Sequence, residues 1–215
     1  MATTPKFIPE SALIKLLPEF RGYSYAKTGA RYPFKIPAIP DSLVGEPLVN
    51  NCCTFVEALL VKAWKDVHGD DFEWNSQRHK QIMIMSDDLF GPVTAIIEAG
   101  MGEELPDKHT LPPAWTIVQG WESIDPLKHG HTFLVLDSHP PTQKILTLES
   151  NFALGMNGPG FRKVGDLDDF PNQHPGGNWH QGEAVWTWNK FHNSFSHMKL
   201  ARLNVENISW IASGA

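Results

Sequence analysis

Apolar positions recur at helical spacing in the first hundred residues of the chain. The strongest pattern covers residues 52–68, where apolar side chains return every three to four positions and predict an amphipathic helix. A second helix is predicted over residues 88–99, with Gly100 as the cap after its last turn. A short helix is predicted over residues 9–17 and is expected to end at Pro18, because proline lacks the backbone N–H that a further turn requires.

After residue 113 the pattern changes to short apolar runs separated by turn residues, which predicts strands. These strands are expected over residues 116–121, 131–137, 144–149, 184–188 and 198–205. The segment 152–182 is rich in Gly, Pro and Asn and is predicted to be a long surface loop. Because helices come first and strands joined by short turns follow, we expect an α+β fold with an antiparallel sheet, formed by residues 1–215 as a single domain.

Composition narrows the classes of function. Of the 215 residues, 41% are hydrophobic and 20% charged, and the net charge of −6 with no long basic run argues against nucleic-acid binding. No apolar stretch approaches the ~20 residues that a membrane span needs, so none is expected. The N-terminal residues lack the basic and apolar segments of a secretory signal. A cytoplasmic location, or export by a route that needs no signal peptide, is therefore expected.

The chain's two cysteines are adjacent, at the predicted start of the helix over 52–68. Asn51 is a good N-cap, and on a helical wheel Cys52 falls within the apolar stripe while Cys53 lies near its edge. The free N–H groups and the helix dipole favour a thiolate at Cys52 and can bind a developing oxyanion. Cys52 is thus the predicted nucleophile. The alternative is an inert cysteine packed in the core.

The turn between the two central predicted strands is centred near Pro140. If paired residue numbers add to 280, His131 at the start of one strand lies beside Glu149 at the end of the next, on the same face. If that face meets the helix that carries Cys52, His131 takes up the thiol proton. Glu149 or Asn151, which has the same parity, then orients the imidazole. The alternative is a histidine bonded to backbone and a solvated glutamate.

Short motifs around these residues resemble those of the NlpC/P60 and CHAP superfamily of papain-like cysteine peptidases and amidases. Residues 51–56 (Asn-Cys-Cys-Thr-Phe-Val) are similar to the motif Asp-Cys-Ser-Gly-Phe-Val that opens the family's catalytic helix. Gly130 and His131 before an apolar strand look like its Gly-His-Val motif, and residues 149–151 (Glu-Ser-Asn) resemble the CHAP pattern in which Glu and Asn follow the catalytic His. The chain departs from the family at Asn51, Cys53 and Thr54.

The resemblance implies a papain-like domain with its core at about residues 48–152 and a catalytic helix packed on an antiparallel sheet. It implies a cysteine hydrolase of amide or peptide bonds, with peptidoglycan as the expected substrate for an amidase or endopeptidase. One alternative is an intracellular thiol hydrolase, deamidase or acyltransferase on the same fold. A second alternative is a binding protein that keeps the fold without the chemistry. The Trp-rich segment 153–215 is expected to elaborate the domain, with Trp179 and His180 bordering a substrate groove. The alternative for residues 174–180 is an ordinary surface loop.

No metal site and no cofactor are expected. His129 and His131 would supply two ligands from one loop, but no Cys-x-x-Cys pair or His-Glu-x-x-His helix accompanies them. The Gly-rich segment 155–160 lacks the Gly-Lys-Ser/Thr ending of a phosphate-binding loop. A peptide or peptidoglycan-type substrate is the expected partner, and an immunity or inhibitor protein is a candidate partner.

Overall fold

The computed structural model describes residues 5–20, 24–25, 31–32, 34–45, 49–69, 74–150 and 181–206. Its main sheet contains the strands β4 (Gly102–Glu104), β5 (Thr116–Ile124), β6 (Leu127–His139), β7 (Lys144–Ser150), β8 (Gln181–Thr187) and β9 (His197–Leu203). All neighbouring strands pair antiparallel, in the order β4-β9-β5-β6-β7-β8. The fold is therefore α+β with one antiparallel sheet, as expected.

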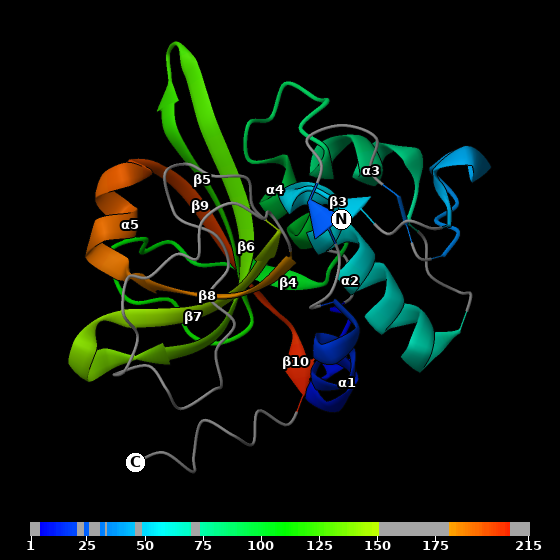
Figure 1. Ribbon diagram of the computed structural model, residues 1–215, viewed down its shortest axis with the longest axis horizontal. Helices are drawn as coiled ribbons and strands as arrows, with labels where there is room; N and C mark the ends of the chain where they lie inside the picture. Colours follow the sequence, from blue (N-terminus) through cyan, green and yellow to red (C-terminus); the bar gives the residue numbers. More distant parts are fainter. Residues whose placement is uncertain are drawn as a thin grey trace.

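Five helices pack around this sheet in the described part of the chain. They are α1 (Glu10–Phe20), α2 (Cys52–His68), α3 (Ser76–Ile82), α4 (Gly91–Glu98) and α5 (Trp188–Ser194). Figure 1 shows α1 to α4 on one side of the sheet and α5 on the other. None of these helices is long and apolar enough to cross a membrane.

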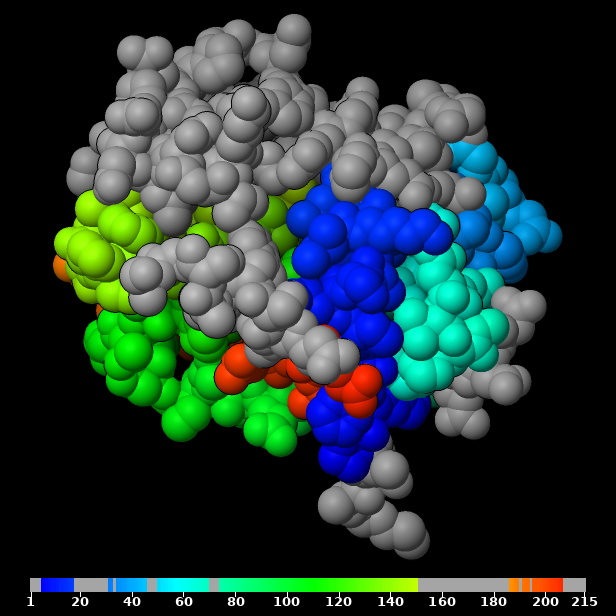
Figure 2. All heavy atoms as spheres, turned by 90° about the horizontal axis from the view of Figure 1, so that it is seen from below, coloured from blue at the N-terminus to red at the C-terminus, as the bar shows by residue number. Residues whose placement is uncertain are grey.

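Two short parallel pairs and two tight turns complete the described structure. Strand β1 (Ile8–Pro9) pairs with β10 (Val205–Glu206), and β2 (Ser24–Tyr25) pairs with β3 (Val49–Asn50). The 3₁₀ turns are η1 (Asp41–Leu43) and η2 (Pro140–Thr142). The first pair brings α1 beside both α2 and the C-terminal strand, as the space-filling view shows (Figure 2).

Side chains of the sheet alternate between two apolar layers, because successive residues of a strand point to opposite faces. On one face, leucines of β6 and β7 join the cluster that contains α2, namely Leu134, Leu136, Leu146 and Leu148. On the other face, Phe133, Val135 and Ile145 pack with the aromatic residues that α5 contributes. The sheet is thus buried on both sides around its central strands, and α2 lies against β6 and β7.

The predicted helices are present with changes at their ends. Helix α2 has the predicted bounds, whereas α4 begins at Gly91 instead of residue 88. Helix α1 was expected to end at Pro18 but continues to Phe20. Pro18 lies in the last turn of α1 and lacks the backbone N–H for one hydrogen bond. Because only two helical residues follow it, the loss of that bond does not end the helix earlier. Helices α3 and α5 were not predicted, because each is only seven residues long.

All five predicted strands exist as β5 to β9. Residues 181 and 182, which were expected to end the long loop, belong to β8, and Trp188 begins α5 instead of ending a strand. The strand predicted over residues 198–205 is interrupted at Asn204, which separates β9 from β10. The loop expected over residues 152–180 lies outside the described residues.

Candidate active site

The start of α2 is held by a reciprocal capping box. The Asn51 carboxamide oxygen accepts hydrogen bonds from the backbone N–H of Cys53 at 3.0 Å and of Thr54 at 2.9 Å. In return, the Asn51 N–H donates to the Thr54 hydroxyl at 2.8 Å. Within the described structure, these bonds leave the Cys52 N–H as the first-turn donor without a backbone or capping partner. This N–H lies at the positive end of the helix dipole, beside the Cys52 thiol.

His131 lies at the start of the buried part of β6 and contacts Glu149 of β7. Its Nε2 lies 2.7 Å from a Glu149 carboxylate oxygen, and the two residues are 1% and 5% exposed. The ring packs beside Phe133 and Phe195, at centroid distances of 5.5 and 6.5 Å. The Cys52 thiol lies near enough to His131 for each group to shift the pKa of the other. Because Nε2 serves Glu149, Nδ1 is the nitrogen left for Cys52.

The acidities of these groups are shifted in complementary directions. Burial alone would lower the pKa of His131, but the Glu149 charge and the hydrogen bonds with Cys52 and Glu149 outweigh it and raise that pKa to about 9. The pKa of Cys52 is well below its usual value, because hydrogen bonds with Cys53 and His131 outweigh burial of the thiolate. At neutral pH the pair is therefore a thiolate beside an imidazolium, the reactive form of a cysteine nucleophile.

Cys53 has the opposite character. The residue is 7% exposed. Its sulfur lies 4.0 Å from the Cys52 sulfur and 3.7 Å from the Thr132 hydroxyl oxygen. The hydrogen bond with Cys52 and burial raise the pKa of Cys53 well above its usual value. The two neighbouring thiols therefore differ: Cys52 is half-buried and ionised, and Cys53 is buried and neutral.

Close packing against Trp121 explains why the residue before His131 is a glycine, Gly130. A Cβ atom on Gly130 would lie 2.5 Å from the Trp121 ring. Trp121 is itself held by a hydrogen bond from its indole N–H to the Leu89 carbonyl, at 2.7 Å. A larger residue at position 130 would therefore push β6 away from β5 just before His131.

The contact between His131 and Glu149 forms as predicted, but the predicted register is wrong. Val135 pairs with Thr147, so paired residue numbers add to 282 near the site, not 280. By this register Phe133 lies opposite Glu149, and His131 lies on the diagonal, which long side chains can span. The difference arises at the turn, which is centred after Pro141 instead of at Pro140, because His139 pairs with Lys144.

A β-bulge at Leu136 puts His131 and Glu149 on the same face. Between the turn and the bulge, paired residue numbers add to 283, as for Ser138 and Ile145. Continued without interruption, that odd sum would place the side chains of His131 and Glu149 on opposite faces of the hairpin. The extra residue, Leu136, changes the sum to 282 and restores a common face.

The condition that α2 meets the His131 face of the hairpin is not fulfilled. The body of α2 clusters with the opposite face, through Leu134 and Leu148 among others, and Cys52 reaches His131 only from the helix tip. The helical wheel likewise placed Cys52 deeper than Cys53, whereas Cys53 is the more buried residue. The wheel fails here because α2 is buried around most of its circumference from Cys53 to Val61.

Three predicted site residues, Asn151, Trp179 and His180, lie outside the described residues. Two buried polar residues near the thiols were not predicted. Thr132 and Gln119 lie on β6 and β5, are fully buried, and are hydrogen-bonded to each other. Their signal in the sequence is a polar side chain inside an apolar strand, and the partner that satisfies it is visible only after the strands pair.

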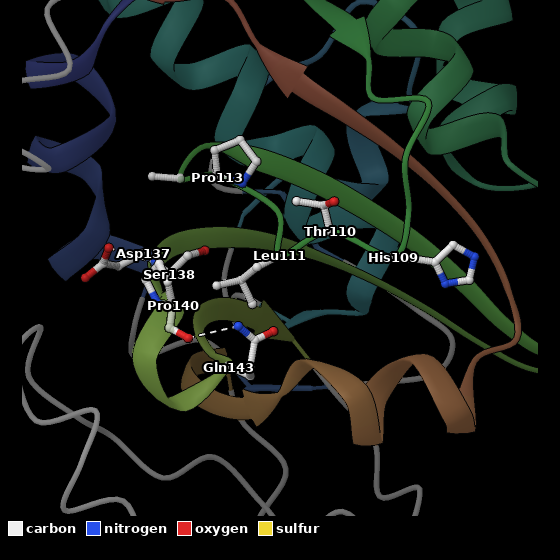
Figure 3. Close-up of a pocket in the computed structure, with 9 residues that line it drawn as sticks. His109, Thr110, Leu111, Pro113, Asp137, Ser138, Pro140 and Gln143 are labelled. Atoms are coloured by element: carbon white, nitrogen blue, oxygen red, sulfur yellow. Dashed lines mark hydrogen bonds between the residues drawn. The ribbon is translucent and has the colours of Figure 1, made fainter.

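A separate cavity of about 500 Å³ lies at the other end of β6, lined by Leu111, Pro113, Asp137, Ser138 and Gln143 among others (Figure 3). Asp137 is six residues from His131, which corresponds to roughly 20 Å along a strand. The cavity is therefore not part of the candidate site. No group of three or more side chains suited to hold a metal ion occurs in the described segments.

The described site thus brings together Cys52, His131 and Glu149, three of the residues singled out from the sequence. A thiolate, an imidazolium and a carboxylate in this order are chemically suited to nucleophilic attack on a carbonyl carbon. Comparison with known proteins found no matching family model, no similar curated protein and no similar solved structure.

Proposed function

We propose that this protein is a cysteine-dependent hydrolase of amide or peptide bonds. Cys52 is the nucleophile, His131 the general acid and base, and Glu149 the group that orients the imidazole. The observation that carries the proposal is a buried imidazole 2.7 Å from the Glu149 carboxylate, near the Cys52 thiol, whose pKa falls through interaction with that imidazole and with Cys53. A histidine kept only for packing needs neither partner in this arrangement.

The site contains a chemical group suited to each step of amide hydrolysis. The Cys52 thiolate attacks the carbonyl carbon, and the Cys52 N–H at the start of α2 donates to the oxyanion that forms. His131, protonated on Nδ1, gives its proton to the leaving amine, and an acyl-thioester remains on Cys52. His131 then accepts a proton from the attacking water, and the thioester breaks to release the acid and restore the thiolate. Glu149 stabilises the imidazolium and holds Nε2 throughout.

The proposed substrate is a peptide of the peptidoglycan type. Support for this class comes from the resemblance of residues 48–152 to the NlpC/P60 and CHAP superfamily, and the papain-like arrangement is part of the same proposal. The helix-borne Cys52, followed in the chain by strands that carry His131 and Glu149, agrees with that arrangement.

The chemistry is tested by labelling and by turnover. Iodoacetamide at about pH 6.5 should alkylate Cys52 in the wild type and leave Cys53 unmodified, as read by peptide mapping. His131→Ala should slow amide cleavage by about 10²–10⁴-fold, the usual contribution of general acid–base catalysis. The matched control is His129→Ala, an exposed histidine two residues away whose partner is the surface residue Glu122.

Hydrolysis of purified peptidoglycan would support the proposed substrate class. Release of ammonia from protein glutamines, or acyl transfer to added amines, without peptidoglycan cleavage would instead assign the thioester chemistry to another substrate. Preferential alkylation of Cys53, or equal rates for the His131 and His129 variants, would overturn the proposed catalytic group itself.

A further inference from the structure

We infer that Cys53 assists catalysis by donating its S–H to the Cys52 thiolate, and that Thr132, whose own proton is donated to Gln119, is the alternative acceptor for that S–H. The inference rests on the proposed function of Cys52. It starts from the chain of contacts in which the Cys53 sulfur lies 4.0 Å from the Cys52 sulfur and 3.7 Å from the Thr132 hydroxyl. The family motif has a serine in place of Cys53, so a donor at this position is compatible with the resemblance.

The hydrogen atoms of this chain can be assigned from its far end. The Gln119 side-chain N–H₂ donates to the Gly120 carbonyl at 3.2 Å, which directs the carboxamide oxygen toward Thr132. The Thr132 hydroxyl donates its only proton to that oxygen. Thr132 can therefore offer Cys53 nothing but a lone pair, and the hydrogen between Cys53 and Thr132 must come from Cys53.

Cys53 thus has one proton and two acceptors, the Thr132 oxygen and the Cys52 sulfur. A thiolate is a much better acceptor than a hydroxyl, so the proton turns toward Cys52 while Cys52 is ionised. When Cys52 carries an acyl group its sulfur is a poor acceptor, and the same proton turns to Thr132. Cys53 stays a thiol in both states, and the buried S–H is never left without an acceptor.

The electrostatics agree with this assignment. Hydrogen bonding between the two thiols is the largest cause both of the lowered pKa of Cys52 and of the raised pKa of Cys53. Cys53 must stay neutral to donate, and Cys52 must be charged to accept. The two requirements agree, because a negative charge on Cys52 opposes ionisation of Cys53.

The test is the pH dependence of Cys52 alkylation by iodoacetamide in four variants of the full chain. Cys53→Ala and Cys53→Val both remove the donor, and Val also fills the space of the thiol. Each should raise the alkylation midpoint by about one pH unit, so that labelling well below both midpoints slows about tenfold. Cys53→Ser keeps a donor and should retain the acid-shifted midpoint. Thr132→Val removes the competing acceptor and should not raise it.

The outcomes separate this inference from the proposed function. A wild-type midpoint near the ordinary thiol value would overturn the proposed nucleophile. An acid-shifted wild type with the same midpoint in Cys53→Val would overturn only the role of Cys53. A rise in Thr132→Val equal to that in Cys53→Val would show that packing around the thiols, and not the donated hydrogen, sets the midpoint. If Cys53→Ala does not fold, the comparison of Val with Ser decides.

Discussion

Cys52 and Cys53 are covalently identical, yet their surroundings shift the two thiol pKa values in opposite directions. Cys52 meets an imidazolium and a neutral S–H, both of which stabilise a negative charge. Cys53 meets a thiolate and apolar packing, both of which oppose one. Reactivity at this site is therefore decided by contacts a few ångströms away and not by residue type.

Glu149 should set the upper pH limit of activity. In the proposed mechanism His131 must be protonated to release the leaving amine, and the Glu149 charge helps to keep its pKa at about 9. The rate should thus fall as pH rises through about 9. Glu149→Gln keeps a hydrogen-bonding side chain but removes the charge, so the pKa of His131 falls and the alkaline limb of the profile of kcat/KM against pH should move to lower pH.

The control for this profile is Glu122→Gln, which removes a carboxylate paired with the exposed His129. Its alkaline limb should coincide with that of the wild type. An unmoved limb in Glu149→Gln would contradict the assignment of that limb to His131.

The strand β6 carries a local irregularity on which the site depends. The bulge at Leu136 shifts the register by one residue, and only the shifted register places His131 and Glu149 on one face. The seven residues from Lys144 to Ser150 of β7 are regular, so the correction is made in β6 alone. The bulge thus takes up the extra residue Leu136, which would otherwise turn His131 and Glu149 to opposite faces.

Deletion of Leu136 should retain the acid-shifted alkylation of Cys52, because the shortened strand can pair Val135 with Thr147 and Asp137 with Leu146 without a bulge, which leaves His131 and Glu149 on one face. The matched variant is Leu136→Ala, which keeps the extra residue and removes only core packing. It should cost about 2–5 kcal/mol of stability but retain the acid-shifted midpoint. Alkylation profiles beside thermal melts measure both effects. The prediction is wrong if either variant folds but loses the low midpoint.

Glu57 of α2 connects segments that are far apart in the chain. Its carboxylate is fully buried and accepts hydrogen bonds from Tyr32 at 2.9 Å and from the indole of Trp74 at 2.6 Å. The His79 Nδ1 lies 2.9 Å from both carboxylate oxygens. The loop around Tyr32, the entry to α3 and α3 itself are thus tied to the helix whose first turn carries Cys52.

Glu57→Leu should lower the free energy of unfolding by about 3–5 kcal/mol, because the buried Tyr32 and Trp74 and the partly buried His79 lose their acceptor together. Urea denaturation measures this change. Asp66→Ala is the control, since Asp66 is an exposed carboxylate on the same helix with an i,i+4 partner in Lys62, and such a pair contributes about 0.5 kcal/mol or less. Equal losses in the two variants would show that Glu57 is not a structural centre.

Local features of the sequence were sufficient for α1, α2, α4 and the strands β5 to β9, and for singling out Cys52, His131 and Glu149. The bounds of α2 follow from the Asn51 cap and the apolar period, and both act within a few residues. The strands β5 to β9 follow from apolar runs between turn residues. The contact between His131 and Glu149 was predicted although their direct pairing was wrong, because the true register near them differs by an even number and leaves every side chain on its face.

Only the tertiary structure decided the bulge at Leu136, the face on which α2 packs, and the partners of Glu57, Cys53 and Thr132. Each depends on residues far apart in the chain: Glu57 meets Tyr32, and Cys53 meets Thr132 across 79 positions. A periodic pattern states which side of an element is apolar, but it does not state which neighbour covers that side or where a buried polar group finds its partner. Those choices minimise the free energy of the whole packed core, so they appear only when all its elements are in place.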